Sequence, residues 1–426
     1  MKHNISEELV QYMVSGITNI CDKFKNRGPG TKSERDAQAQ LKTELEEYAD
    51  EVIMEDFNEH PAAFMGFIPL AALLAVTSVA LYWFNPANGS WLAWLLGGLS
   101  VALPLFAALM FVFEFLMYRD FVDFLFPKKV SRNVYGTYKP SGEVKKRIIF
   151  GGHTDAANEW TYQWLGGAAA LAPVIFGGVV SIFYILGINI ARLANALPAT
   201  SVDGPWKTLG WIAIATIPFT IAIMFFINYK IIVDGANDNL SANYISMAII
   251  KEMKERGFRF ENTEVGCLFS GSEEAGLRGA KAFAKKHKDE LIADGVETIF
   301  ISLDTMTDPD QLMVYTRGCT GTVGDDKAVG DLLQEAGKNC GKELPIAGWY
   351  PGAVDAEAFS MYGLRSCGFC GLRHDPPPKY FYHTRNDNVD ALNPECLAMS
   401  LDICLEAAEI FDAKGMAPFD AARKKK

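Results

Sequence analysis

Charged side chains are absent from three long stretches of this 426-residue chain, which carries 40 Lys and Arg against 51 Asp and Glu. No Asp, Glu, Lys or Arg occurs in residues 60–113, 160–191 or 208–229. Half of the residues are hydrophobic, which excludes a disordered chain and a protein that only binds nucleic acid. Uncharged runs this long are rare in soluble folds, so they favour membrane spans over buried helices of a large soluble core.

Two features of secreted proteins are also missing. The eight cysteines follow no regular framework, which fits a reducing compartment better than a disulfide-stapled domain. Residues 1–25 are charged and amphipathic and contain no apolar core of a secretory signal. Cys367 and Cys370 form a C-x-x-C motif, but no second pair accompanies it. We expect a structural strand pair there, with redox or metal chemistry as the alternative.

The uncharged stretches are long enough to cross a bilayer, which takes roughly 20 helical residues for a core of about 30 Å. We predict four spans, at residues 62–84, 91–117, 164–190 and 208–228, arranged as two hairpins. Tryptophans cluster near the span ends, as interfacial aromatics do. The flanks of the spans hold more Lys and Arg than the hairpin tips, which offer only Arg192 and Lys207. The positive-inside rule therefore predicts that the soluble part lies in the cytoplasm.

The remaining residues alternate between strand and helix patterns. This alternation predicts an α/β fold in which a mixed sheet is sandwiched between helices. Residues 1–61, 118–163 and 229–426 form one predicted domain, into which the hairpins at 62–117 and 164–228 are inserted. The predicted strands are 51–57, 133–138, 147–151, 264–269 and 297–303, and the predicted helices are 5–25, 33–50, 239–255, 273–287, 328–338 and 394–414.

Polar side chains follow three of the predicted strands. His153 and Asp155 come after 147–151, Glu273 and Glu274 after 264–269, and Asp304 directly after 297–303. Open α/β sheets collect ligands at the carboxyl ends of their strands, so we expect these groups to meet in one crevice.

Two further segments add candidate ligands. Asp238 lies in a turn that begins a helix, and His383 lies on a loop near the C-terminus. Two histidines and several carboxylates without cysteine fit a pair of zinc-type divalent ions that share a bridging carboxylate and a water. Each motif alone has a structural alternative: Glu273 and Glu274 could simply begin a helix, and Asp238 could be a turn residue.

The motifs together resemble those of the co-catalytic di-zinc aminopeptidase family, which includes glutamate carboxypeptidases and, distantly, glutaminyl cyclases. The similarity extends over the soluble sequence, in the family's order, and includes an N-terminal run from Ile20-Cys21 through Arg27 to Glu34. It is carried by His153-x-Asp155, Gly235-Ala236-Asn237-Asp238-Asn239, Ser272-Glu273-Glu274-Ala275-Gly276-Leu277-x-Gly279, Asp304, and Tyr382-His383-Thr384 followed by Asp387.

The resemblance implies a zinc-exopeptidase fold and a role for each matching residue. His153 and Asp304 would bind one zinc ion, Glu274 and His383 the other, and Asp238 would bridge them. Glu273 would be the general base that takes a proton from the bridging water.

Asp155 would orient His153, and a cis peptide bond would follow Asp238. The family often has an Asp-His pair before an apolar helix, where this chain has Asp355-Ala356. Substrate contacts there differ from the family pattern.

These features predict a membrane-anchored zinc metallopeptidase that removes N-terminal residues from peptides. Carboxypeptidase or glutaminyl cyclase-like chemistry remains open, as does a non-catalytic peptide-binding receptor or sensor on the same fold. Manganese or cobalt could replace zinc. The expected partners are a peptide and the lipid bilayer, with no nucleic acid. The preferred residue and the oligomeric state stay open. The hairpins could shape substrate access or serve only as anchors.

Overall fold

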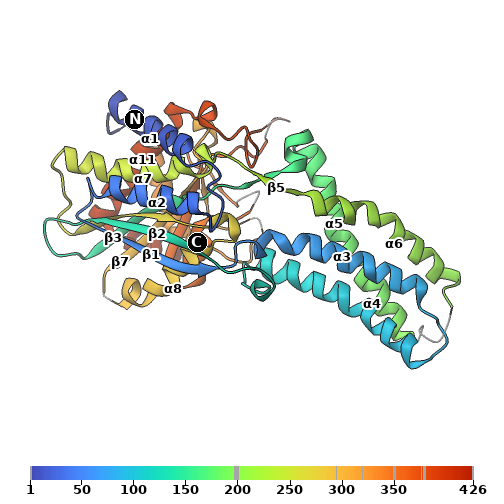
Figure 1. The fold of residues 1–426 in the computed structure, drawn as a ribbon. Helices are drawn as coiled ribbons and strands as arrows, with labels where there is room; N and C mark the ends of the chain where they lie inside the picture. Colours follow the sequence, from blue (N-terminus) through green and yellow to red (C-terminus); the bar gives the residue numbers. More distant parts are fainter. Residues whose placement is uncertain are drawn as a thin grey trace.

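The computed structural model describes residues 2–195, 201–293, 295–318, 320–348, 352–375, 377 and 380–424. Figure 1 shows an α/β domain from which a bundle of long helices, α3 to α6, projects. The bundle is inserted at two places, after the first strand and before β5 (Ile227–Ile232). Both insertion points agree with the two predicted hairpins.

An eight-stranded mixed sheet forms the centre of the α/β domain, in the order β1-β2-β6-β3-β7-β10-β8-β9. Its four central strands, β6, β3, β7 and β10, run parallel. On either side of them, β2 pairs antiparallel with β6 and β8 pairs antiparallel with β10, while the edge strand β1 pairs antiparallel with β2 and the edge strand β9 pairs parallel with β8. The carboxyl ends of the four parallel strands therefore lie at one edge, as the sequence predicts. The strands are β1 (Glu51–Glu59), β2 (Lys129–Tyr138), β3 (Lys146–His153), β6 (Thr263–Ser270), β7 (Glu297–Asp304), β8 (Met313–Tyr315), β9 (Ile346–Ala347) and β10 (Arg365–Cys370).

Helices cover both faces of the sheet and bury its apolar side chains. One face carries α1 (Glu7–Lys23), α2 (Lys32–Leu45), α7 (Ser241–Glu255), α9 (Lys327–Asn339), α11 (Pro394–Lys414) and α12 (Ala417–Lys424). The other face carries α8 (Arg278–Ala293) and α10 (Asp355–Met361). The sandwich agrees with the fold class predicted from the sequence.

The structure changes two predicted helix starts. Helix α2 is capped by the side chain of Thr31, which accepts a hydrogen bond from the N–H of Glu34. The helix predicted to start at Glu273 instead starts at Arg278, because a 3-10 turn (Glu273–Ala275) and two residues with positive φ come first. Gly276 is one of those two, and its φ of 92° lies in the region that glycine tolerates best.

The bundle consists of α3 (Ala63–Phe84), α4 (Trp91–Met110), α5 (Thr161–Ala194) and α6 (Gly204–Ala222). A π-helical segment (Phe111–Leu116) extends α4, and α5 is kinked at Gly166 and Gly167. Four helices here are long and apolar enough to cross a membrane. They match the predicted spans within a few residues, except that the fourth ends earlier because Ile227 already belongs to β5.

Candidate metal and catalytic site

The predicted site residues meet at the carboxyl edge of the parallel strands. His153 ends β3 and Asp304 ends β7. Glu273 and Glu274 form the turn after β6, and Asp238 lies in the segment (Ala236–Leu240) that leads into α7. These five side chains and His383 line one cavity of about 510 Å³. The structure thus brings together residues that are up to 230 positions apart.

The Asp238 carboxylate lies between the two histidines. Its Oδ1 is 3.2 Å from Nε2 of His153, and its Oδ2 is 3.2 Å from Nε2 of His383. Nε2 of His153 is also 3.8 Å from Asp304, and Nε2 of His383 is 3.4 Å from Glu274. Nε2 of His153 is equally close, at 3.8 Å, to Oε2 of Glu273. Both histidines therefore face Asp238, with Asp304 and Glu273 near His153 and Glu274 near His383.

The unpartnered atoms of this cluster fit a divalent metal. Asp238 Oδ2 and Glu274 Oε1 are buried and accept no hydrogen bond, although both face His383. Two ligands each about 2.0–2.2 Å from a tetrahedral zinc ion lie about 3.3 Å apart, close to the distances seen here. One donor atom each from His153, Asp238 and Glu274 also lies within 4.8 Å of the other two. The donor set is histidine and carboxylate, which zinc accepts.

The charges of the buried carboxylates in this cluster also favour a bound divalent cation. Burial raises the pKa of the Glu273 and Glu274 carboxyls well above the usual value, and it raises the pKa of Asp304 to about 8. Burial also acts to raise the pKa of Asp238, but the adjacent imidazoles of His153 and His383 leave that pKa below the usual value. So many buried carboxylates at one point repel each other, and a divalent cation would relieve that repulsion.

Asp155 connects two of the strand ends. Its Oδ1 accepts a hydrogen bond from the N–H of Glu273 at 2.9 Å, and its Oδ2 accepts one from the N–H of Glu274 at 3.0 Å. Its backbone carbonyl lies 3.0 Å from Nδ1 of His153, which leaves Nε2 facing Asp238 and Asp304. One residue therefore fixes the turn of both glutamates and the orientation of an imidazole.

Two buried residues hold the loops of the site, although the sequence pattern gave neither a role. Asp387 accepts hydrogen bonds from the backbone N–H groups of Asn237 and Asp238, at 2.9 and 3.2 Å. Arg27 donates to the backbone carbonyls of Thr154, at 3.2 Å, and of Asp234, at 2.6 Å. Both lie within quoted motifs, but their function depends on contacts that only the fold creates. The peptide bond after Asp238 is cis, as the resemblance implies.

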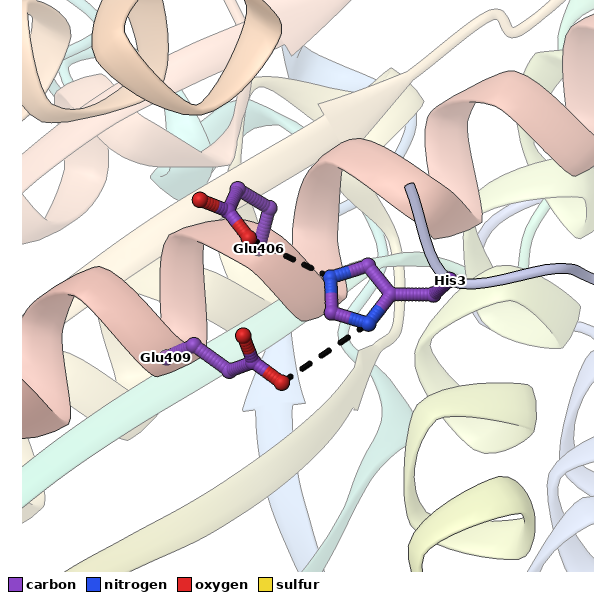
Figure 2. A group of neighbouring side chains, drawn as sticks. All are labelled: His3, Glu406 and Glu409. Atoms are coloured by element: carbon purple, nitrogen blue, oxygen red, sulfur yellow. Dashed lines mark hydrogen bonds and ion pairs between the residues drawn. The ribbon is translucent and has the colours of Figure 1, made fainter. Parts of the chain in front are cut away.

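A second group of a histidine and two carboxylates lies where the N-terminal segment contacts α11 (Figure 2). Nε2 of His3 is 3.3 Å from Glu406 and its Nδ1 is 3.7 Å from Glu409. The Lys2 ammonium pairs with both glutamates. Because the Lys2 ammonium already pairs with both carboxylates, we interpret this group as a contact that holds the N-terminal segment against α11.

A comparison with protein families agrees with the geometry of the site. Residues 221–408 match the sequence model of peptidase family M28. This match agrees with the family that the sequence motifs resemble, and it supports a metallopeptidase, with zinc as the metal that the family implies. No curated protein matches the chain.

Solved structures share the fold of this chain at low sequence identity. An aminopeptidase from Aneurinibacillus sp. strain AM-1 aligns with a TM-score of 0.54 at 15% identity, covering 96% of each chain. A glutaminyl cyclase from an Acidobacteriales bacterium aligns with a TM-score of 0.54 at 12% identity, covering 97% of this chain and 98% of that one. A Zn-dependent exopeptidase from Parabacteroides distasonis has a TM-score of 0.50 at 11% identity, covering 94% and 97%. The zinc-exopeptidase fold is thereby shown.

Proposed function

We propose that the chain is a membrane-anchored, zinc-dependent aminopeptidase. The observation that carries the proposal is the Asp238 carboxylate, whose two oxygens each face a different histidine. This arrangement suits a carboxylate that bridges two metal ions. The match to the metallopeptidase family supports the same chemistry.

The proposed ligands divide into two sets. His153 and Asp304 would hold one zinc ion, Glu274 and His383 would hold the other, and Asp238 would contact both. Zinc would supply a Lewis acid for the substrate carbonyl and would make a water molecule acidic near neutral pH. Two further site residues, Glu273 and Asp155, do not bind the metal ions.

Glu273 is the proposed general base. It lines the cavity, and its Oε2 lies 3.8 Å from Nε2 of His153. Its carboxylate takes a proton from the attacking water, holds it, and passes it to the amine that leaves when the C–N bond breaks. Asp155 keeps the Glu273 backbone in place through the hydrogen bond to its N–H. Asp155 is thus a positioning residue.

The helix bundle is the proposed membrane anchor. Both hairpins cross the bilayer, and the α/β domain made of residues 1–61, 118–163 and 229–426 lies on the cytoplasmic side. The excess of Lys and Arg in the flanks of the spans supports this orientation. Peptides at the membrane surface are then within reach of the site.

Metal analysis combined with hydrolysis of leucine p-nitroanilide tests the function. We expect about two zinc ions per chain, and Glu273→Gln should keep them while turnover falls by about 10²–10⁴-fold. Glu261→Gln, at an exposed position of the α/β domain, is the matched control and should keep full turnover. A metal-loaded wild type that hydrolyses no peptide with a free N-terminus would contradict the aminopeptidase. Cyclisation of an N-terminal glutamine by that protein would instead indicate glutaminyl cyclase chemistry.

A further inference from the structure

The cavity that holds the candidate site does not stop at the α/β domain. Besides the metal-type residues, its lining includes Phe64, Phe67 and Ala71 of α3 and Phe111 and Phe115 beyond α4. The longest part of the lining comes from α5. We call the part of the cavity between these helices the bundle chamber. It places an apolar space of the helix bundle in direct continuity with Glu273 and His383.

One face of α5 forms the wall of the bundle chamber. The lining residues Ala168, Leu171, Ala172, Ile175, Val179 and Ile182 recur at the helical spacing of three or four. From the first to the last, the helix rises by about 20 Å. Half of a bilayer's hydrocarbon core is about 15 Å thick. The chamber therefore spans about the depth of one lipid chain.

Near its middle, the α5 wall of the chamber reaches the outer surface of the bundle. Phe176, which also lines the cavity, is 72% exposed, and the neighbouring Ala172 is exposed as well. These two residues are four positions apart and so share a helix face. If the bundle is in the membrane, the bilayer itself lies against this opening. A molecule dissolved in the bilayer could then enter sideways.

The chemistry of the lining selects the kind of molecule. From Ala168 to Ile182 the α5 wall offers only hydrocarbon side chains. An extended peptide in such a space would leave its N–H and C=O groups without partners, at a cost of several kcal/mol for each group. A hydrocarbon chain has no such groups. The volume of about 510 Å³ is also in the range of pockets that enclose one small ligand.

We propose that the substrate is an amphiphilic amide, whose hydrocarbon chain occupies the bundle chamber while its scissile bond lies beside Glu273. This inference rests on the proposed hydrolysis and on membrane insertion of the bundle. Hydrolysis forms a C–O bond from water and breaks the C–N bond. The products are a carboxylic acid and an amine that receives the proton held by Glu273. An aminopeptidase would take the hydrocarbon chain on the amine side of the amide. A chain on the acyl side occupies the place of the free amino group, and its cleavage would make the activity that of a deacylase.

Chain-length dependence tests the proposal with the full protein in lipid nanodiscs. One pair of substrates, leucine dodecylamide and leucine ethylamide, places the chain on the amine. The other pair, N-dodecanoyl-leucine and N-acetyl-leucine, places it on the acyl group. At equal surface concentration, the dodecyl member of one pair should show a kcat/KM about tenfold or more above its short partner, because apolar pockets discriminate by that much or more per methylene. Equal turnover within both pairs would overturn the proposal.

Substitutions in α5 provide the matched comparison. Ala168→Phe and Ala172→Phe fill the chamber and should abolish the preference for the long chain. Ala169→Phe adds the same group to the same helix at an exposed position that does not line the cavity, and should retain it. An equal loss in all three variants would mean that the bundle, not the chamber, determines the preference, and the proposal would fall.

A binding readout separates this proposal from the proposed function. A leucine dodecylamide with a diazirine at the chain end should label the α5 segment around Ala172 and Val179 in the Glu273→Gln protein. If leucine p-nitroanilide is hydrolysed but labelling falls elsewhere, the hydrolase stands and the chamber proposal fails. If labelling occurs as expected but no amide is cleaved, the chamber binds the chain and the hydrolase assignment is wrong. Labelling outside the segments that line the chamber contradicts the proposal whether or not amides are cleaved.

Discussion

Nη2 of Arg278 lies 2.9 Å from Oε1 of Glu114, and both side chains are almost completely buried. Arg278 begins α8, directly after the turn that carries Glu273 and Glu274, while Glu114 lies at the end of the second apolar helix. The same guanidinium binds both oxygens of Asp123 at 2.8 Å. This ion pair joins the candidate catalytic turn to the helix bundle.

Breaking this pair should destabilise the protein. Glu114→Gln removes the most deeply buried of three carboxylates around the Arg278 guanidinium, and because Asp120 and Asp123 remain, the cost should be below the roughly 3–5 kcal/mol typical for loss of a sole partner. We expect a clearly lower midpoint in thermal unfolding of the detergent-solubilised protein. Asp36→Asn, which breaks the exposed pair with Lys32, should shift the midpoint little. Similar shifts of the unfolding midpoint for the two variants would show that the buried ion pair contributes no more stability than the exposed one.

Asp387 should control metal affinity without being a ligand. Asp387→Asn weakens the hydrogen bonds that the carboxylate accepts from the N–H groups of Asn237 and Asp238. Loss of such a supporting group typically lowers metal affinity by about 10–100-fold, which zinc titration against a competing chelator would measure. Asp390→Asn, at an exposed position three residues on, is the control and should bind zinc like the wild type. Unchanged affinity in Asp387→Asn would refute this role.

The guanidinium of Arg27 should not be replaceable by an ammonium. Arg27→Lys keeps the charge but lacks the planar fork that reaches the carbonyls of Thr154 and Asp234. Each buried carbonyl left without a donor costs about 1–3 kcal/mol, so the unfolding midpoint should fall. The exposed Lys25 pairs with the Asp234 carboxylate, and Lys25→Met should have a much smaller effect. The prediction fails if Arg27→Lys unfolds at the wild-type temperature.

Zinc removal should lower stability as well as activity. Without a cation, the carboxylates of Asp238, Glu274 and Asp304 face each other in a buried space. A ligand present at 100 times its dissociation constant adds about 2.7 kcal/mol to folding, so the unfolding midpoint should rise with zinc concentration after chelator treatment. The same titration should restore hydrolysis. A midpoint that does not respond to zinc would contradict a metal site in this cluster.

Cysteine labelling tests the proposed orientation. The described cysteines are buried, so the native background from them should be low. Asn88→Cys, in the loop between α3 and α4, should react with a membrane-impermeant maleimide on intact cells. Lys32→Cys, which is exposed on the α/β domain, should react only after the cells are opened. The reverse pattern would place the domain on the other side of the membrane.

The sequence alone predicted the four long helices and the strands β1, β2, β3, β6 and β7 in their order along the chain, but not the strands β5, β8 and β9. Missing charge predicts the four long helices, because only an apolar run of about 20 residues can cross a bilayer. Alternating patterns predict the sandwich, and polar residues at the ends of β3, β6 and β7 predict one shared crevice, since the carboxyl ends of parallel strands meet at one edge. These features depend on local spacing, which a sequence carries directly.

The tertiary structure decided what those elements do together. Arg27 and Asp387 act through contacts with Thr154, Asp234 and Asn237, which are far away in the chain, so no local pattern marks them. The start of α8 at Arg278 depends on the positive φ at Gly276, which the acidic pattern of Glu273 and Glu274 did not reveal. The continuity of the site with the α5 wall arises only when helices separated in sequence pack around one space. Such packing depends on contacts between residues that are far apart in the chain, and only the folded structure brings these residues together.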